Sequence, residues 1–222
     1  MTEYEPDAIV HSYITEYIRN ELAKNTGILA ELEEYAAEHE VPIVQPETAK
    51  LLLNLGYLKR QKRILEVGCA IGYSSILLSQ TLAEGGKIDT LEFLPDVAAI
   101  AKSNVQRAGL SGVINVIEAD AKEYLPNIKE NEAYDFIFLD GPKAHYIYML
   151  DECVRLLTPG GVLVSDNVLY KGMTATNELV KRRKITIVKR LRKYITALTN
   201  HPQLETSVLS VGDGVTVSVK KY

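Results

Sequence analysis

Five short apolar runs alternate with helix-length segments through the middle of this 222-residue chain. The runs span residues 63–67, 87–93, 113–119, 134–140 and 161–167. The segments between them span residues 72–83, 95–108, 121–129 and 144–157. Short apolar strands that are covered on both faces by intervening helices form a doubly wound, mainly parallel sheet. The alternation therefore predicts an α/β fold.

Each end of the chain adds to this pattern. The runs 204–211 and 214–221, joined through Gly212-Asp213-Gly214, predict an antiparallel hairpin that brings the sheet to seven strands. Residues 9–22 and 28–39 space apolar side chains by three and four, as amphipathic helices do. Pro46, with a Glu directly after it, indicates the start of another helix. We expect an N-terminal helical extension over residues 1–45 and one main domain over residues 46–222.

Composition narrows the class of protein. Hydrophobic residues make up 46% of the chain and charged residues 24%, as in ordinary globular proteins. No window approaches 18 consecutive apolar residues, and the first six residues contain two acids, Glu3 and Glu5, and no base, so we expect neither a membrane span nor a secretory signal. The two cysteines, Cys69 and Cys153, fit neither a disulfide framework nor a CxxC metal spacing. These features predict a cytoplasmic protein.

The residues that follow the first three strands indicate a nucleoside-containing cofactor. In a doubly wound sheet, ligands bind beyond the carboxyl ends of the strands. Gly68 and Gly72 flank a tight turn after the first strand and let a ligand approach the backbone. Glu92 ends the second strand, where it can accept hydrogen bonds from two ribose hydroxyls, and Asp120-Ala121 follows the third, where an adenine amino group could be met. The two glycines are spaced as GxxxG and not as GxGxxG, which argues against a pyrophosphate cradle. The alternative to a cofactor site is a sharp turn that the glycines merely permit, with Glu92 in solvent.

Oxygen-bearing side chains follow the fourth and fifth strands. Asp140 ends one, and Asp166-Asn167 ends the next. Two carboxylates and an amide oxygen form a hard ligand set that suits Mg²⁺, Mn²⁺ or Ca²⁺ better than zinc. Taken singly, each Asp is equally well explained as a helix cap or turn residue. Together with the cofactor loop, they predict a metal site at this edge of the sheet.

These motifs resemble those of the cation-dependent class I O-methyltransferases of the catechol and caffeoyl-CoA type, whose cofactor is S-adenosylmethionine. The likeness covers residues 43–222 and is carried by the segments ILEVGCAIGYSS, DTLEF, EADA, YDFIFLDGPK and GGVLVSDN. It implies a Rossmann-like methyltransferase fold, with residues 46–222 as the S-adenosylmethionine-dependent domain, and a homodimer. The sequence departs from many relatives at Ala70-Ile71, which affects the packing of the loop more than the chemistry.

The resemblance also implies roles for individual residues. The cofactor would be held by Glu66, Gly68, Gly72, Tyr73, Ser74, Glu92, Asp120, Ala121 and Asp140. The divalent cation, most simply Mg²⁺, would be held by Asp140, Asp166 and Asn167. Asp140 and Lys143 would be the catalytic residues, with Lys143 as the general base in its neutral form. On the residues alone, a solvated loop lysine is the alternative for Lys143, and His145 competes for the role of base.

A basic segment stands out near the C-terminus. Eight Lys or Arg residues and no acid lie between Lys181 and Lys193, although the whole chain has a formal net charge of −4. A helix over about residues 176–198 would carry these cations opposite an apolar sector. Lys184, however, falls inside that apolar sector. We therefore expect the regular helix to begin after Lys184, with residues 181–184 forming a basic loop beside the active site. The cluster is either a solvated face or a phosphate-binding surface. The candidate nucleic-acid contacts are Lys181, Arg182, Arg183, Arg190 and Arg192.

The chemistry of the acceptor connects this segment to the metal site. In 5-hydroxyuridine, the 5-hydroxyl and the C4 carbonyl are vicinal oxygens, as in a catechol. The basic insertion and the segment VGDGVTVSVKK resemble the bacterial branch that methylates 5-hydroxyuridine at the wobble position of tRNA, giving 5-methoxyuridine. A base in the anticodon loop can be splayed into a pocket and stacked on a ring, for which Tyr146, Tyr148 and Tyr170 are candidates.

We therefore predict an S-adenosylmethionine-dependent O-methyltransferase that acts on the anticodon loop of tRNA. A small phenolic acceptor, either a catechol or a hydroxycinnamoyl compound, is the alternative substrate. A non-catalytic module that binds S-adenosylmethionine or RNA is the alternative from another class. The set of Asp140, Asp166 and Asn167 argues against such a module, because binding alone does not need metal ligands.

Overall fold

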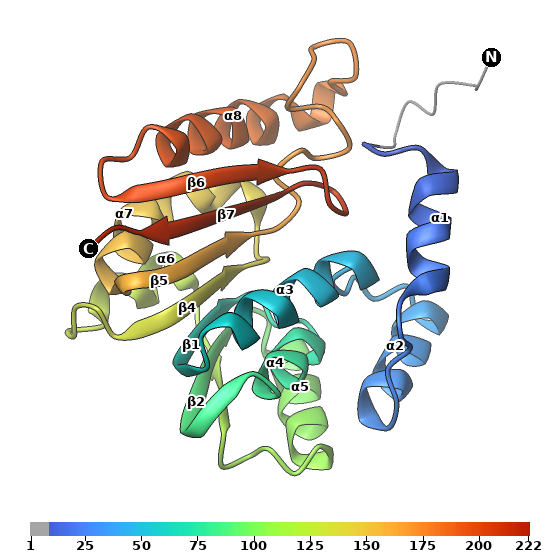
Figure 1. The fold of residues 1–222 in the computed structure, drawn as a ribbon, viewed down its shortest axis with the longest axis vertical. Coiled ribbons are helices and arrows are strands. Elements are labelled where there is room, and N and C mark those ends of the chain that lie inside the picture. The colour runs from blue at the N-terminus through green and yellow to red at the C-terminus, as the bar shows by residue number, and fades with distance from the viewer. Residues whose placement is uncertain (1–8) are drawn as a thin grey trace.

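The structure, a computed structural model, describes residues 9–222 and has a seven-stranded sheet at its centre (Figure 1). The strands are β1 (Gln61–Val67), β2 (Leu82–Glu92), β3 (Ile114–Glu118), β4 (Tyr134–Leu139), β5 (Leu157–Ser165), β6 (Leu204–Leu209) and β7 (Val215–Lys220). Their order is β3-β2-β1-β4-β5-β7-β6; β1 to β5 are parallel, and β7 runs antiparallel to both neighbours. The predicted doubly wound sheet with an antiparallel C-terminal hairpin is confirmed. Residues 1–8 of the predicted extension lie outside the described residues.

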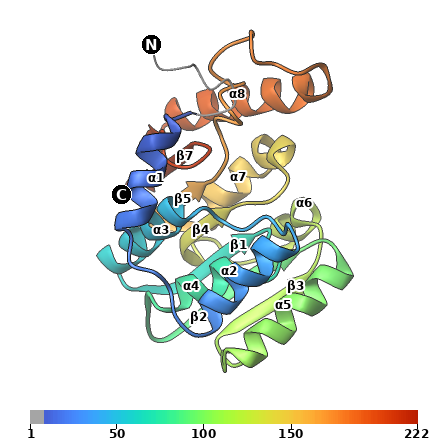
Figure 2. The same ribbon diagram turned by 90° about the vertical axis from the view of Figure 1, so that its right-hand side faces the viewer.

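Helices cover both faces of the sheet (Figures 1 and 2). One face is covered by α2 (Ile28–Glu38), α3 (Pro46–Leu58), α4 (Tyr73–Ser79) and α5 (Pro95–Arg107). The other face is covered by α6 (Ala121–Tyr124), α7 (Tyr146–Leu156) and α8 (Ile185–Thr199), with 3-10 turns at Leu125–Asn127, Lys143–His145 and Arg182–Lys184. No helix in residues 9–222 is long and apolar enough to cross a bilayer.

The two N-terminal helices are attached differently. Helix α2 buries Leu29, Leu32 and Ala36 in the same apolar cluster as α3, α4 and α5. Helix α1 (Ser12–Glu21) buries none of its residues and lies against α3, where Arg19 forms an ion pair with Glu47 at 2.9 Å. The second helix of the predicted extension is therefore part of the main core, and the domain boundary at residue 45 stays a prediction.

The central strands bury both of their faces. Ile64 of β1 and Phe136 of β4 pack on the side of α3, α4 and α5, whereas Leu65 and Ile137 pack on the side of α7 and α8; all four are fully buried. A strand covered on both faces has no polar face, so it is an almost continuous apolar run. This burial explains why these runs were recognisable in the sequence.

Strand β2 begins earlier than its apolar pattern predicts. The expected helix over residues 72–83 ends at Ser79, and the strand starts at Leu82, where it pairs with Gln61. The register then shifts, so that Lys87 pairs with Arg63. Gly85 lies in this irregular stretch with φ of +74°, a conformation that glycine adopts without strain. The polar and glycine-rich start of β2 is therefore not visible as an apolar run.

Helix α8 begins at Ile185 and not near residue 176, in agreement with the position of Lys184 in the apolar sector. The segment before it is held in turns by Arg192, whose guanidinium donates hydrogen bonds to the carbonyls of Met173 (3.1 Å) and Thr174 (2.9 Å) and to Asn177 Oδ1 (2.7 Å). These bonds satisfy carbonyl groups that a helix would otherwise have satisfied. Residues Arg182–Lys184 form a 3-10 turn and not an irregular loop.

The C-terminal strand is fastened to the sheet by a buried lysine. Lys220 is 6% exposed, and its ammonium donates hydrogen bonds to the carbonyls of Leu157 (2.7 Å) and Val154 (3.0 Å). We expect Lys220→Met to lower the free energy of unfolding by about 1–3 kcal/mol, because two buried acceptors lose their donor. Lys221→Met, at an exposed neighbour, should change it by less than about 0.5 kcal/mol. Equal urea midpoints for the two variants would contradict this role.

Candidate active site

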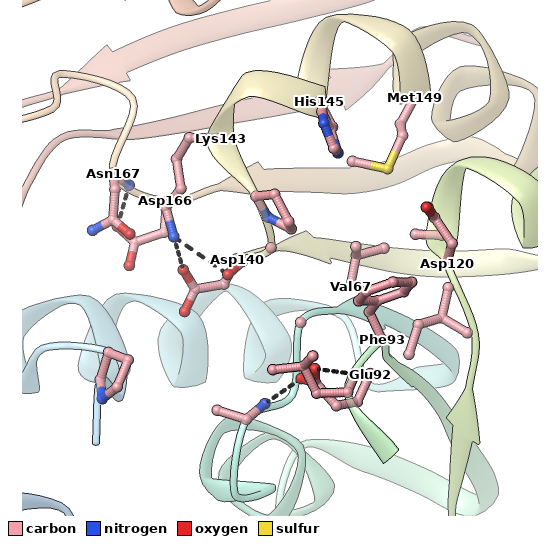
Figure 3. Close-up of a pocket in the computed structure, with 18 of the residues that line it drawn as sticks. Val67, Glu92, Phe93, Asp120, Asp140, Lys143, His145, Met149, Asp166 and Asn167 are labelled. Atoms are coloured by element: carbon pink, nitrogen blue, oxygen red, sulfur yellow. Dashed lines mark hydrogen bonds and ion pairs between the residues drawn. The ribbon is translucent and has the colours of Figure 1, made fainter. Parts of the chain in front are cut away.

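A cavity of about 630 Å³ opens at the carboxyl edge of the parallel strands (Figure 3). Each of the five parallel strands contributes a polar or glycine residue to its wall at or just after its last residue. These residues are Gly68, Glu92, Asp120, Asp140 and Asp166. Parallel strands bring their carboxyl ends to one edge, so residues far apart in the chain meet here. Ala121, Lys143, His145 and Asn167 also line the cavity.

The loop after β1 approaches the loop after β4 very closely. Gly68 has φ of +89°, and a Cβ atom there would lie 2.7 Å from the Cα atom of Gly141. No other residue fits this position without displacing backbone. The loop is also tied to β2, because the amide of Ala70 donates to Glu92 Oε2 at 3.1 Å and the amide of Leu94 donates to Oε1 at 3.0 Å. These two bonds hold the Glu92 carboxylate at the cavity wall.

Glu66 is fully buried behind this loop. Its Oε2 atom accepts hydrogen bonds from Ser75 and from Thr90 (2.5 Å), while Oε1 has no hydrogen-bond partner among the described residues. Burial raises the pKa of this carboxyl group, and the hydroxyl donors oppose the rise. Glu66, Gly72, Tyr73 and Ser74 are not among the residues that line the cavity. The cofactor role of these four residues stays a prediction.

Tyr73 connects the start of α4 to the N-terminal segment. Its ring is 2% exposed, and its hydroxyl donates to Glu33 Oε1 at 2.5 Å. Asn25 donates to the same hydroxyl at 3.1 Å and to Glu33 at 2.7 Å. Asn25 and Glu33 belong to no motif in the sequence, and neither was predicted to act near the loop. The side chain of Tyr73 is thus fixed by residues that lie some 40 positions earlier in the chain.

The residues after β4 and β5 form a compact charged group on one side of the cavity (Figure 3). Lys143 Nζ lies 2.9 Å from Asp140 Oδ1, and Asp166 Oδ1 accepts a hydrogen bond from the amide of Asn167 at 2.7 Å. Burial raises the pKa of Asp140, and the Lys143 charge opposes this rise. Burial and the charge of Asp140 raise the pKa of Asp166 to about 7. Two carboxylates therefore repel each other beside a single ammonium group.

The donor set at this edge consists of oxygen atoms only. Within residues 9–222, no group of three or more His, Cys, Asp or Glu side chains is arranged to hold a metal ion. The set here contains two acids, Asp140 and Asp166, and the amide of Asn167, all of which line the cavity. Asn167 has φ of +55°, a left-handed conformation that Asn tolerates better than most residues. The fit is chemical: hard oxygen donors with net negative charge suit a hard divalent cation.

Comparisons with known proteins agree with this arrangement. Residues 19–221 match the O-methyltransferase family. The chain belongs to this family. A catechol O-methyltransferase from Niastella koreensis is 30% identical over 213 residues, which are 94% of this chain and 92% of that protein.

Two solved structures extend the likeness to the fold. The O-methyltransferase from Bacillus cereus in complex with SAH has a TM-score of 0.83 and 28% identity, and the match covers 94% of this chain and 97% of that one. The O-methyltransferase TomG from Streptomyces achromogenes, involved in tomaymycin synthesis and solved in complex with SAM, has a TM-score of 0.83 and 25% identity over 100% of both chains. The predicted enzyme class, an S-adenosylmethionine-dependent O-methyltransferase, is confirmed by the family and by these neighbours. The homodimer and the cytoplasmic location stay predictions.

The three tyrosines considered for stacking differ in accessibility in this O-methyltransferase. Tyr146 is fully buried, so its ring cannot stack on a base, and that candidate was wrong. Tyr148 is 59% exposed, and the guanidinium of Arg190 lies over its ring at 5.1 Å. Tyr170 is partly buried and has Lys184 over its ring at 5.8 Å. Tyr148 is the ring best placed to meet a ligand from solvent.

The predicted nucleic-acid residues also separate into two groups. Lys181, Arg182 and Arg183 are exposed, and Arg190 is partly exposed over Tyr148. Arg192 is also partly exposed, but its guanidinium donates hydrogen bonds that hold the turns at residues 173–177, so its role as a nucleic-acid contact stays a prediction. We call the exposed cations Lys181, Arg182 and Arg183, together with Arg190, the basic face. His145 lines the cavity, and its pKa is lowered by burial, by the charge of Lys122 and by the charge of Arg190. Arg190 therefore links the basic face to the cavity.

The position of Tyr73 generates a prediction about the cofactor loop. We expect Tyr73→Phe to lower the free energy of unfolding by about 0.5–1.5 kcal/mol, since Glu33 loses one of its two hydrogen-bond donors and keeps Asn25. Its affinity for S-adenosylhomocysteine should stay within about twofold of the parent, because the hydroxyl points to α2. Tyr35→Phe, at an exposed ring on α2, is the matched control and should change neither quantity. A selective loss of ligand affinity in calorimetry would show instead that the hydroxyl contacts the cofactor.

Proposed function

We propose that this O-methyltransferase binds S-adenosylmethionine in the cavity and transfers its methyl group to a hydroxyl that has a second oxygen beside it. The observation that carries the proposal is the distribution of the wall residues. Glu92, held by two backbone amides, offers a carboxylate to ribose hydroxyls. Asp120 and Ala121 line the cavity where we place the adenine, and Asp140 with Lys143 lines it where we place the reacting groups. The complexes of the Bacillus and Streptomyces relatives with SAH and SAM support the same ligand here.

The cofactor assignment is tested at Glu92. Glu92→Gln replaces one carboxylate oxygen by an amide donor, so a ribose hydroxyl loses a charged acceptor. We expect the dissociation constant for S-adenosylhomocysteine, measured by calorimetry, to rise at least about tenfold. Glu118→Gln removes the same charge from the exposed end of the neighbouring strand β3 and should leave the affinity unchanged. Equal affinities for both variants would place the ribose elsewhere.

We further propose that Asp140, Asp166 and Asn167 hold a divalent cation, most simply Mg²⁺. When bound, such a cation supplies Lewis acidity that favours the deprotonated form of a chelating acceptor. Lys143 Nζ lies 2.9 Å from Asp140 Oδ1. In its neutral form, Lys143 would take the proton of the acceptor hydroxyl. Residues of the cavity wall would also hold the reacting groups in position, and positioning is a large part of what methyl transfer requires.

The acceptor that we propose is 5-hydroxyuridine in the anticodon loop of tRNA. Arg190 of α8 lies over Tyr148, and its charge acts on His145 at the cavity wall, while the exposed cations of the turn Arg182–Lys184 directly precede the same helix. Clustered cations without acids bind phosphates by releasing counterions, and an exposed ring can stack an unpaired base. A small phenol is the second candidate, favoured by the Niastella relative, which is a catechol O-methyltransferase.

The basic face separates these two acceptors. We expect the triple variant Arg182→Gln, Arg183→Gln, Arg190→Gln to bind tRNA more weakly, with a log–log salt slope reduced by about 0.7 for each lost phosphate contact. Methylation of tRNA containing 5-hydroxyuridine should fall with binding, whereas methylation of a small catechol should not, because phosphate contacts position a substrate and do not perform the chemistry. Both reactions are measured with Mg²⁺ and again with excess EDTA, which should stop them.

The matched control removes the same charge from the opposite edge of the sheet. Lys59, Arg60 and Lys62 are exposed around the amino end of β1, so their replacement by Gln should leave tRNA binding and its salt slope unchanged. Parental tRNA methylation in the Arg182, Arg183, Arg190 variant would assign the acceptor to the small phenols. Full activity in EDTA would remove the cation from the proposal.

A further inference from the structure

Tyr146 is a buried tyrosine whose hydroxyl reaches the backbone of the charged group in the cavity. It is the first residue of α7 and is 0% exposed. Its single hydroxyl proton is shared between two acceptors, the carbonyl of Leu139 at 2.9 Å and the carbonyl of Asp166 at 3.2 Å. One hydroxyl therefore bridges the residue just before Asp140 and the residue Asp166 itself. No motif in the sequence indicates such a contact.

The bridge lies at the point where the regular pairing of β4 and β5 ends. The last paired residues are Leu139 and Ser165, and beyond them the amide of Asp166 donates to the carbonyl of Leu139 at 2.9 Å. The carbonyl oxygen of Leu139 thus accepts two hydrogen bonds, one from Asp166 and one from Tyr146, which uses both of its lone pairs. The hydroxyl thus adds a second connection between the ends of β4 and β5, beside the hydrogen bond from the amide of Asp166.

There is an electrostatic reason for such a connection. Asp140 and Asp166 lie together in a buried place, and when both are ionised the repulsion between them acts to spread the strand ends. Lys143 neutralises only part of this charge from the side of Asp140. Burial and the two carboxylates raise the pKa of Tyr146 well above its usual value, so its hydroxyl keeps the proton that it donates.

We propose that Tyr146 is a positioning residue that fixes the separation of Asp140 and Asp166 through their backbone. The inference rests on the proposed function, in which these two side chains hold the cation and frame the acceptor. Tyr146 touches neither ligand nor reacting atoms and acts only through the strand ends. Partners of this kind behind metal ligands typically contribute 10–100-fold in metal affinity or activity.

The chain offers a matched control in a second buried tyrosine. Tyr194 of α8 is also 0% exposed and packs edge-on against Tyr146, with ring centroids 5.4 Å apart. Its hydroxyl bonds to Ser165 Oγ at 2.6 Å, a side chain next to Asp166, and not to the backbone of either acid-bearing segment. Removing this hydroxyl perturbs the same packing without cutting the bridge.

The test compares Tyr146→Phe with Tyr194→Phe at a temperature well below the unfolding temperature of either variant. The probe is Mn²⁺ binding measured by calorimetry in the presence of S-adenosylhomocysteine, together with kcat and KM for methyl transfer to the acceptor that the parent uses. We expect Tyr146→Phe to weaken Mn²⁺ binding and to lower kcat by at least about tenfold, with KM for S-adenosylmethionine unchanged. Tyr194→Phe should stay within about twofold of the parent in all of these quantities.

The crystal structure of each variant supplies a readout that depends on neither metal nor activity. The Cα atoms of Asp140 and Asp166 should lie farther apart in Tyr146→Phe than in the parent and in Tyr194→Phe. If the parent itself binds no Mn²⁺, the cation of the proposed function fails, while this separation still decides the role of Tyr146. An unchanged separation, or the same loss of Mn²⁺ affinity and kcat in both variants, would overturn the inference and leave Tyr146 with packing alone.

Discussion

The burial of two carboxylates beside one ammonium group is the constraint around which this active site is built. Asp140 and Asp166 lie at the ends of adjacent parallel strands, and their mutual repulsion and desolvation disfavour the ionised pair. Folding accepts this arrangement because the strands beneath them are fixed by fully buried residues such as Phe136 and Leu163. The buried apolar strands thus supply the free energy of folding that offsets the cost of burying the two carboxyl groups.

The surrounding loops show how closely the backbone must be controlled at such a site. Gly68 allows the loop after β1 to lie against Gly141, next to Asp140, where any side chain would collide with backbone. Two amides of the same region orient Glu92. The Tyr146 hydroxyl ties the ends of β4 and β5 together. Three different devices, a missing side chain, two amides and one hydroxyl, therefore limit movement at one edge of the sheet.

Sequence reasoning located the strand ends because topology alone brings them together, so Glu92, Asp120, Asp140 and Asp166 were all expected at one edge. Side-chain direction was harder to infer. Arg190 and Arg192 are two positions apart, which on a helix turns them by about 200°, so one lies over Tyr148 and the other holds the turns at residues 173–177. A count of charges cannot separate them. Likewise, the partner of Tyr73 comes from α2, at a distance in sequence that no local motif spans.

The charge distribution of the chain bears on how a polyanionic acceptor would reach the cavity. Outside Lys181–Lys193 the formal charge is −12, from 17 basic and 29 acidic residues, whereas that segment carries +8. Charges more than about 8–10 Å from a phosphate are largely screened at physiological salt. A phosphate on the basic face therefore interacts mainly with the charges that lie close to it. Leu191 and Tyr194 of α8 are buried in the same apolar cluster as Leu139 of β4, so this helix keeps a fixed position relative to the carboxylate pair.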